Sequence, residues 1–205
     1  KMEYVKVLIN GDWIGFTDQD IHHIPFPYPW LKNANSEDFL LKSIEDIVSQ
    51  GIDLNKDICG FTLETFQGWG SIFYPVEYVK EISKICKQYD IVLTFDEMQS
   101  GFARTGKKFG YEHYNISPDL ICVGKGMGGG VPLSGVIGKG EIMDLPDVGN
   151  MSSTHSANPL VCSAGLAVLQ EIEDKELVYQ SQIKGKVLLN GLNKLKSKYP
   201  QKISY

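Results

Sequence analysis

The sequence predicts an α/β fold built on a parallel or mixed sheet with helices on both faces. Short apolar runs, each long enough for one strand, alternate along the chain with amphipathic helical patterns. The runs are almost continuously apolar, which is typical of strands that are buried on both faces. Ligands bind beyond the carboxyl ends of the strands in such sheets, so the residues that follow each run are the candidates for function.

The composition fits one domain with a substantial core. The chain has 205 residues, of which 42% are hydrophobic, and a formal net charge of −5. This mild acidity gives no basic surface for nucleic acid or an anionic membrane, and no apolar run approaches the roughly 20 residues that span a bilayer. The four cysteines are scattered and form no CxxC pair. We therefore expect reduced thiols in a cytoplasmic protein, with neither zinc nor disulfides.

The first part of the chain predicts a strand, a loop and a helix. Residues 4–10 form an apolar run that predicts a strand. In residues 22–30, three prolines alternate with aromatic residues, which excludes a helix and predicts an extended surface loop. His22 and His23 diverge on an extended chain and have no nearby cysteine or carboxylate, so we expect no metal there. Residues 36–50 repeat apolar residues at helical spacing.

The middle of the chain predicts two strands that each end at an acidic residue. Residues 57–63 form a mostly apolar run that is followed by Glu64. Residues 77–89 then show the spacing of an amphipathic helix. The next apolar run, residues 91–95, is followed by Asp96. Two carboxylates are therefore expected at the carboxyl edge of the sheet.

A third strand end carries a lysine. Residues 120–123 form an apolar run that ends at Gly124, and Lys125 comes next, ahead of the flexible segment 126–130. The apolar pattern resumes at residues 133–137. Lysines usually lie on polar helix faces, so a lysine at the end of a buried strand, beside backbone with few side chains, indicates a chemical role. Two further helices are expected at residues 158–178 and 182–199, the second ended by Pro200.

These residue types fit one cofactor. A lysine amine whose pKa is lowered from its usual value of about 10.4 adds to carbonyl groups. Pyridoxal phosphate (PLP), the common carbonyl cofactor, needs such a lysine, a carboxylate at its pyridine nitrogen and donors for its phosphate. Lys125 and Asp96 fit the first two needs. Ser153 and Thr154, which precede a helix, can hydrogen-bond a phosphate.

Less specific interpretations remain open for each of these residues. A strand that ends in Asp-Glu is also found in NTPases, although the chain has no GxxxxGK[ST] phosphate loop. The glycines at 126–130 taken alone are compatible with a simple turn. Arg104 is more typical of a structural ion pair than of a substrate contact.

Five short motifs carry a resemblance to a known family. They are ETFQG at 64–68, FDEMQSGFARTG at 95–106, PDLICVGK at 118–125, GGGVP at 128–132 and STHSANP at 153–159. In order and spacing, from about residue 22 to residue 177, the chain resembles the class-III PLP-dependent aminotransferases. This family contains the ornithine, 4-aminobutyrate and ω-amino acid aminotransferases. The resemblance implies the large domain of a fold-type-I PLP-dependent transferase, present here incompletely, with a mixed and mostly parallel sheet.

The resemblance also implies a role for each matching residue at the cofactor. Lys125 would hold PLP as a Schiff base and then move a proton between the substrate and the cofactor. Asp96 would pair with the pyridine nitrogen. Met98 would lie against the ring face, where the family usually has Val or Ile, and Gln99 would bond the phenolic oxygen.

Other residues are implied to act around that centre. Thr154, with Ser153 beside it, would reach the phosphate of the cofactor of the partner subunit, because family active sites lie at a homodimer interface. Glu64 and Arg104 would support the residues that touch the cofactor.

The resemblance implies transfer of an amino group from an amino acid or ω-amine donor to an oxo acid or aldehyde acceptor. Decarboxylation or racemisation on the same fold is one alternative, and a non-catalytic domain that binds a partner is another. Residues 1–174 would be the carboxyl-terminal portion of the PLP-binding domain and residues 175–205 the start of a small domain. Two upstream family segments, a phosphate loop and an aromatic-His-Gly segment, are not found. We therefore expect the fragment alone to bind PLP weakly and to be inactive. The sequence does not specify the donor or the acceptor.

Overall fold

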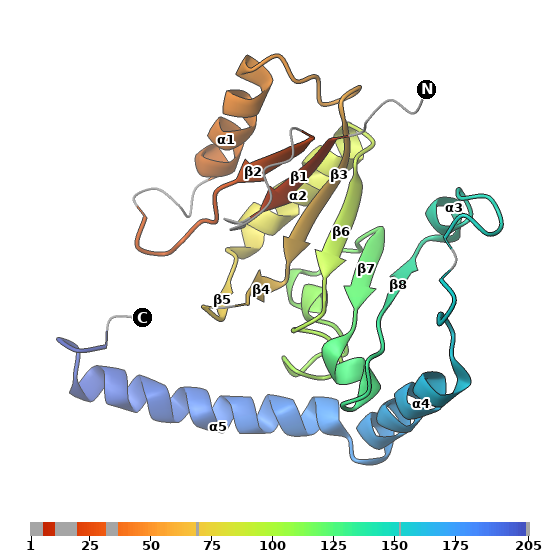
Figure 1. Ribbon diagram of the computed structural model, residues 1–205. Helices are drawn as coiled ribbons and strands as arrows, with labels where there is room; N and C mark the ends of the chain where they lie inside the picture. Colours follow the sequence, from red (N-terminus) through yellow and green to blue (C-terminus); the bar gives the residue numbers. More distant parts are fainter. Residues whose placement is uncertain (1–5, 11–19, 32–36, 69, 152, 204–205) are drawn as a thin grey trace.

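A six-stranded sheet forms the centre of the molecule (Figure 1). The computed structural model describes residues 6–10, 20–31, 37–68, 70–151 and 153–203. The sheet has the order β2-β1-β3-β6-β7-β8, in which every neighbouring pair is parallel except β7 and β8. Its strands are β1 (Lys6–Asn10), β2 (Ile21–Ile24), β3 (Ile58–Glu64), β6 (Val92–Asp96), β7 (Leu120–Val123) and β8 (Gly135–Gly138). The predicted α/β fold with a mixed, mostly parallel sheet is confirmed.

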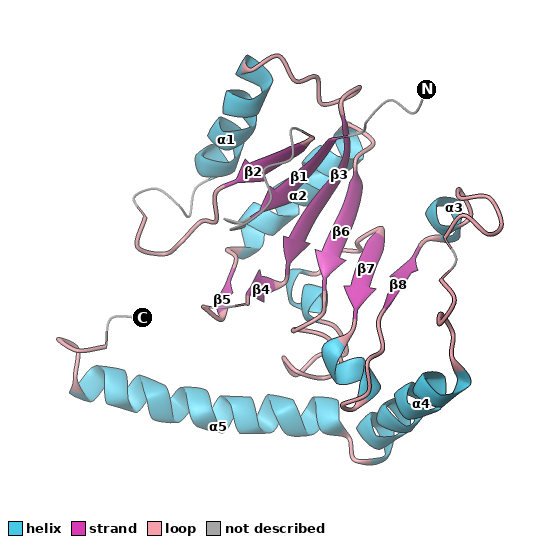
Figure 2. Cartoon of the chain, viewed as in Figure 1, coloured by secondary structure: helices cyan, strands magenta, loops and turns pink. Residues whose placement is uncertain are grey.

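Helices and a small hairpin complete the fold (Figure 2). The helices are α1 (Glu37–Ser49), α2 (Val76–Gln88), α3 (Gly140–Met143), α4 (Pro159–Asp174) and α5 (Leu177–Lys198), with the short 3-10 helices η1 (Gly110–Tyr114) and η2 (Lys125–Gly128). Strands β4 (Phe66–Gln67) and β5 (Ile72–Phe73) pair with each other as a separate antiparallel hairpin. Among the described residues, none of the helices combines the length and the apolar character needed to cross a bilayer.

The core joins the central strands to helices α1 and α2, which pack against each other. Helix α2 buries the side chains that the sequence placed on its apolar face, among them Tyr78, Ile82 and Cys86. From the sheet, Phe61, Phe95 and several neighbouring side chains are completely buried. Full burial of a phenylalanine contributes about 1.5–3 kcal/mol, so this packing fixes the register of β3, β6 and β7.

The prediction of a loop over residues 22–30 was wrong for its first residues. Residues Ile21–Ile24 form β2 and pair in parallel with β1. Proline cannot donate a backbone hydrogen bond, and the first proline of the segment is Pro25. The residues before it keep their N–H groups and can therefore pair with a neighbouring strand.

The boundary between the last two helices also differs from the prediction. Helix α4 ends at Asp174 and α5 begins at Leu177, rather than near residues 178 and 182. Glu176 between them has a left-handed backbone with φ of 49°, which stops the helix. The apolar side chains of these helices are largely exposed, as shown by 76% for Leu160 and 68% for Leu166. Figure 2 shows why, because α4 and α5 lie beyond the carboxyl ends of the strands and not over the sheet.

All four cysteines are free, and only Cys86 is fully buried. Burial raises the pKa of its thiol to about 12. The thiolate is the reactive form, so at pH 8 only about one Cys86 in ten thousand is reactive. We expect iodoacetamide to label Cys162, which is partly exposed on α4, well before Cys86. Cys86 should react only after unfolding in denaturant. Peptide mass spectrometry would measure both rates, and equal labelling in the native protein would contradict the burial of Cys86.

Candidate active site

Three neighbouring strands bring the predicted strand-end groups to one edge of the sheet. Glu64 at the end of β3 pairs in register with Asp96 at the end of β6. Asp96 pairs in turn with Cys122 in β7. Lys125 follows Cys122 by three residues and opens η2. The strand order therefore places two carboxylates and one amine in sequence along the carboxyl edge.

The backbone of Lys125 has an uncommon conformation. Its φ is +43°, in the left-handed region that non-glycine residues rarely adopt. Such a conformation costs on the order of 1 kcal/mol or more, and it persists where the surrounding structure determines it, often at functional sites. Gly124 before it is buried, whereas the lysine itself is exposed. The turn therefore projects the amine away from the end of β7.

The amine projects toward a cavity of about 590 Å³. The cavity lies between the strand ends, the β4–β5 hairpin and helices α4 and α5. Its volume is within the usual range of about 300–1,000 Å³ for small-molecule sites. Its lining comprises Phe66, Ser71, Met98, Gln99, Gly101, Phe102, Arg104, Lys125, Gly126, Val168, Ile172 and Leu177. The set combines one amine, one guanidinium and one amide with apolar walls.

Asp96 lies at the strand end beside this cavity, although it does not line the cavity itself. Its side chain is partly buried, and its Oδ1 accepts a hydrogen bond of 2.9 Å from the Met98 N–H. Within the described part of the chain, its carboxylate makes no ion pair and no other hydrogen bond. One oxygen therefore orients the turn after β6, and the other is available to a ligand.

Met98 lies directly against the backbone that leads to the lysine. A β-carbon at Gly124 would collide with Met98 Sδ. Any larger residue at position 124 would therefore displace Met98 from the cavity wall. The close approach of the Met98 side chain therefore explains why a residue without a side chain occupies position 124.

Glu64 and Gln99 meet at the turn that follows β3. Glu64 Oε2 accepts a hydrogen bond of 3.0 Å from the Gly68 N–H, and Gln99 Nε2 donates one of 3.2 Å to the Gly68 carbonyl oxygen. A β-carbon at Gly68 would lie only 2.7 Å from Glu64 Oε1 and 2.9 Å from Gln99 Oε1. Glu64 thus supports the same turn that Gln99 contacts.

The remaining predicted residues lie in different places. Arg104 is exposed and lines the cavity beside Lys125, and the described residues offer its guanidinium no ion pair. The expected structural ion pair of Arg104 is therefore not formed with any described residue. Ser153 and Thr154 are exposed in the loop between α3 and α4 and do not line the cavity.

The sequence did not show that Glu97 and Asp96, which are adjacent, have different surroundings. The Glu97 side chain is completely buried and accepts four hydrogen bonds. Side chains alternate between the two faces of a strand, and this alternation indicates that Glu97 and Asp96 point to opposite sides.

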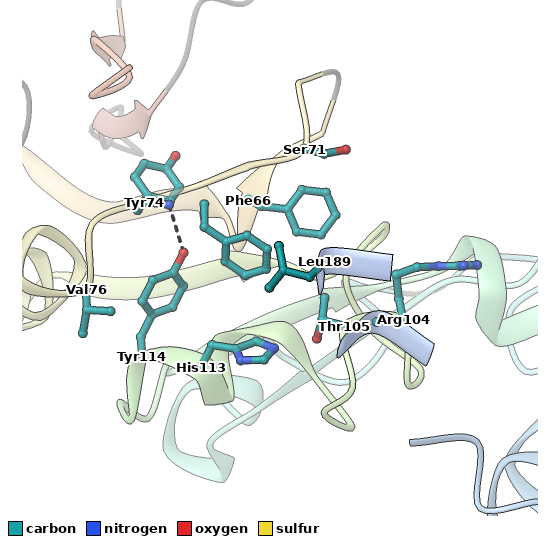
Figure 3. Close-up of a pocket in the computed structure, with 11 residues that line it drawn as sticks. Phe66, Ser71, Tyr74, Val76, Arg104, Thr105, His113, Tyr114 and Leu189 are labelled. Carbon is teal, nitrogen blue, oxygen red and sulfur yellow. Dashed lines mark hydrogen bonds between the residues drawn. The ribbon is translucent and has the colours of Figure 1, made fainter. Parts of the chain in front are cut away.

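A second cavity of about 590 Å³ lies between the β4–β5 hairpin, η1 and α5 (Figure 3). It shares Phe66, Ser71 and Arg104 with the first cavity. Five of its eleven lining residues are aromatic, and the Tyr74 N–H donates a hydrogen bond of 3.2 Å to the Tyr114 hydroxyl there. Among the residues that the structure describes, neither a lysine nor a carboxylate lines it. We therefore place the chemistry in the cavity that Lys125 lines.

Comparison with known proteins gives one consistent family. The family model described as "Aminotransferase class-III" matches residues 10–205. The chain is 35% identical over 189 residues to a probable 4-aminobutyrate aminotransferase of Bacillus subtilis, covering 88% of this chain and 43% of that protein. It is 37% identical over 188 residues to a leucine/methionine racemase of Thermococcus litoralis, covering 88% of this chain and 42% of that protein.

A solved structure gives the same fold. A transaminase from the marine bacterium Virgibacillus superposes with a TM-score of 0.82 at 26% identity, covering 94% of this chain and 48% of that chain. The present chain thus spans less than half the length of these relatives.

Proposed function

Because the chain belongs to the class-III aminotransferase family, we propose that the protein is a PLP-dependent aminotransferase. It transfers an amino group from an amino acid or ω-amine donor to an oxo acid or aldehyde acceptor. Membership in the family implies PLP as the cofactor. The observation that carries the proposal is the register of β3, β6 and β7, which brings the ends of these strands together beside one cavity.

The residues present fit the aldehyde and ring portions of PLP. Lys125 supplies an amine, Asp96 has an oxygen free of partners within the described residues, and Met98 supplies an apolar wall. Ser71 and Arg104 also line the cavity and can donate hydrogen bonds to a phosphate. We expect residues 1–205 alone to bind PLP weakly, because the phosphate loop of the family is not found in them.

Each of these residues has a distinct task in amino transfer. When bound, PLP supplies an electron-withdrawing ring that stabilises negative charge on the substrate carbon. Lys125 would bond the cofactor aldehyde through Nζ and would carry a proton at the substrate carbon. Asp96 would hold a proton at the ring nitrogen. Met98 would shield the ring from water, and Gln99 would donate a hydrogen bond to the phenolic oxygen.

We further propose a cytoplasmic homodimer with shared active sites. The exposed position of Thr154, away from its own cavity, supports contact with the partner's cofactor phosphate, with Ser153 beside it. The break between α4 and α5 supports a domain boundary at about residue 174, with residues 1–174 in the PLP-binding domain and residues 175–205 in the small domain.

Racemisation is the alternative to be tested, because one relative at 37% identity is named a leucine/methionine racemase. Racemisation also begins with loss of a proton from the substrate carbon, but a proton then returns to that carbon from the opposite side. The strand-end residues therefore fit both reactions. The fate of the amino group distinguishes them.

One experiment tests both candidates. The purified protein is mixed with PLP, and the absorbance is scanned for the band of cofactor bound covalently to a lysine. Amino donors, including 4-aminobutyrate and leucine, are then added with pyruvate or 2-oxoglutarate. A new amino acid from the acceptor supports amino transfer, and loss of optical purity of leucine, the chiral donor, without transfer supports racemisation. Absence of the absorbance band from the full-length protein, at PLP concentrations that saturate weak binding, contradicts both.

A further inference from the structure

We propose that Glu97 is a positioning residue that fixes the three strand ends relative to one another. It thereby sets the placement of Asp96, Gln99 and Lys125 toward the cofactor. The predicted effect on the cofactor rests on the proposed function. The predicted effect on the strand ends does not.

The carboxyl group of Glu97 is enclosed by four hydrogen-bond donors. Oε1 accepts from Thr65 Oγ1 at 2.6 Å and from the Tyr111 N–H at 2.7 Å. Oε2 accepts from Ser100 Oγ at 2.7 Å and from the Gly110 N–H at 2.8 Å. The side chain is 0% exposed. Each oxygen therefore receives one hydroxyl and one backbone N–H, with no contact to solvent.

These donors come from segments that are distant in the sequence. Thr65 follows Glu64 at the end of β3, whereas Gly110 and Tyr111 open η1. The backbone N–H of Glu97 also donates to the Cys122 carbonyl oxygen in β7 at 2.9 Å. One residue thus connects the ends of all three strands that carry the candidate catalytic groups.

The packing around the carboxyl group leaves little room for rearrangement. A β-carbon at Gly110 would lie 2.6 Å from Thr65 Cγ2 and 2.8 Å from Ser100 Cβ. No lysine or arginine pairs with Glu97 among the described residues. Neutral donors alone stabilise this buried group, and each donor loses its partner if the carboxyl group is removed. A buried donor without a partner is strongly unfavourable.

Glutamine at position 97 is the sharpest test because it keeps the shape of the side chain. The amide has one oxygen and one NH₂ group. Since each carboxyl oxygen now accepts a backbone N–H, either orientation of the amide sets its NH₂ against the N–H of Gly110 or Tyr111. Two donors then face each other in the buried site, and one segment must move away.

Glu112→Gln is the matched control. Glu112 lies in the same region, and its Oε1 accepts one hydrogen bond of 2.7 Å from the Phe109 N–H. A glutamine there keeps an oxygen that can accept the same bond. The two variants make the same chemical change, but only the change at position 97 creates opposed donors.

For Glu97→Gln we expect at least about a tenfold weaker affinity for PLP, as loss of buried hydrogen bonds implies. We also expect a shifted pH titration of the cofactor absorbance, which a residue with no influence on the cofactor environment would leave unchanged. Glu112→Gln should stay within about twofold of the parent protein. Ser100→Ala removes only one of the four donors and should give an intermediate effect, which keeps the test available if Glu97→Gln does not fold.

Hydrogen–deuterium exchange tests the strand ends without the cofactor. In Glu97→Gln, or in Ser100→Ala, faster exchange is expected in peptides covering residues 64–68, 96–101 and 110–111, with the first residues of β3 unchanged. Exchange like that of the parent protein would overturn the proposal, as would equal acceleration in Glu112→Gln. If the parent protein shows no lysine-bound cofactor band, the proposed function fails, and the exchange measurement still decides the role of Glu97.

Discussion

Replacement of Lys125 by alanine is expected to lower the rate of amino transfer by about 10⁴-fold, at the upper end of what general acid–base catalysis contributes. The expected loss is large because, in the proposed function, one nitrogen performs two tasks, the covalent bond to the cofactor and the movement of a proton. Lys125 is the one lysine among the described residues that line the cavity. The band of covalently bound cofactor should disappear from the absorbance spectrum.

Two controls separate this chemistry from loss of structure. Lys184→Ala removes an exposed lysine on α5 and should leave both activity and absorbance unchanged. Lys125→Arg keeps a positive charge in the cavity, but a guanidinium remains protonated and does not bond the aldehyde. It should therefore be as inactive as Lys125→Ala. A lysine-bound band that survives in Lys125→Ala would place the covalent bond on another residue.

The sequence indicated which edge of the sheet carries the candidate site, because the local pattern of apolar residues determines where each strand ends. Glu64, Asp96 and Lys125 each follow an apolar run, and the hydrophobic effect buries such runs as strands. Their neighbouring positions follow from the parallel pairing of β3, β6 and β7. This part of the prediction needed no knowledge of side-chain contacts.

Features that depend on distant partners were not visible in the sequence. Residues Ile21–Ile24 form a strand because β1 offers free backbone groups beside them, and the local sequence does not encode this pairing. Glu97 acquires its role from donors as far apart as Thr65 and Tyr111. The exposure of Leu160 and Leu166 on α4 was likewise not visible, since periodicity shows that a helix has an apolar face but not what covers it.

Replacement of Asp96 by asparagine is expected to lower the rate of amino transfer by about 10²- to 10³-fold, as does loss of one preorganised electrostatic contact in an active site. Asparagine is nearly isosteric, and its side-chain oxygen can still accept the hydrogen bond that Asp96 Oδ1 receives from the Met98 N–H. The turn after β6 should therefore stay in place. What is lost is the negative charge that holds a proton on the ring nitrogen of the cofactor.

This reasoning predicts different spectra for the two losses. In Asp96→Asn the lysine-bound cofactor band should persist, because Lys125 is intact, while turnover falls. In Lys125→Ala the band itself should vanish. Asp46→Asn, which neutralises an exposed aspartate on α1, serves as the matched control and should change neither property. Full activity in Asp96→Asn would show that the carboxylate at the end of β6 does not hold the ring proton. The proposal that Lys125 and Asp96 act together on one cofactor would then be contradicted.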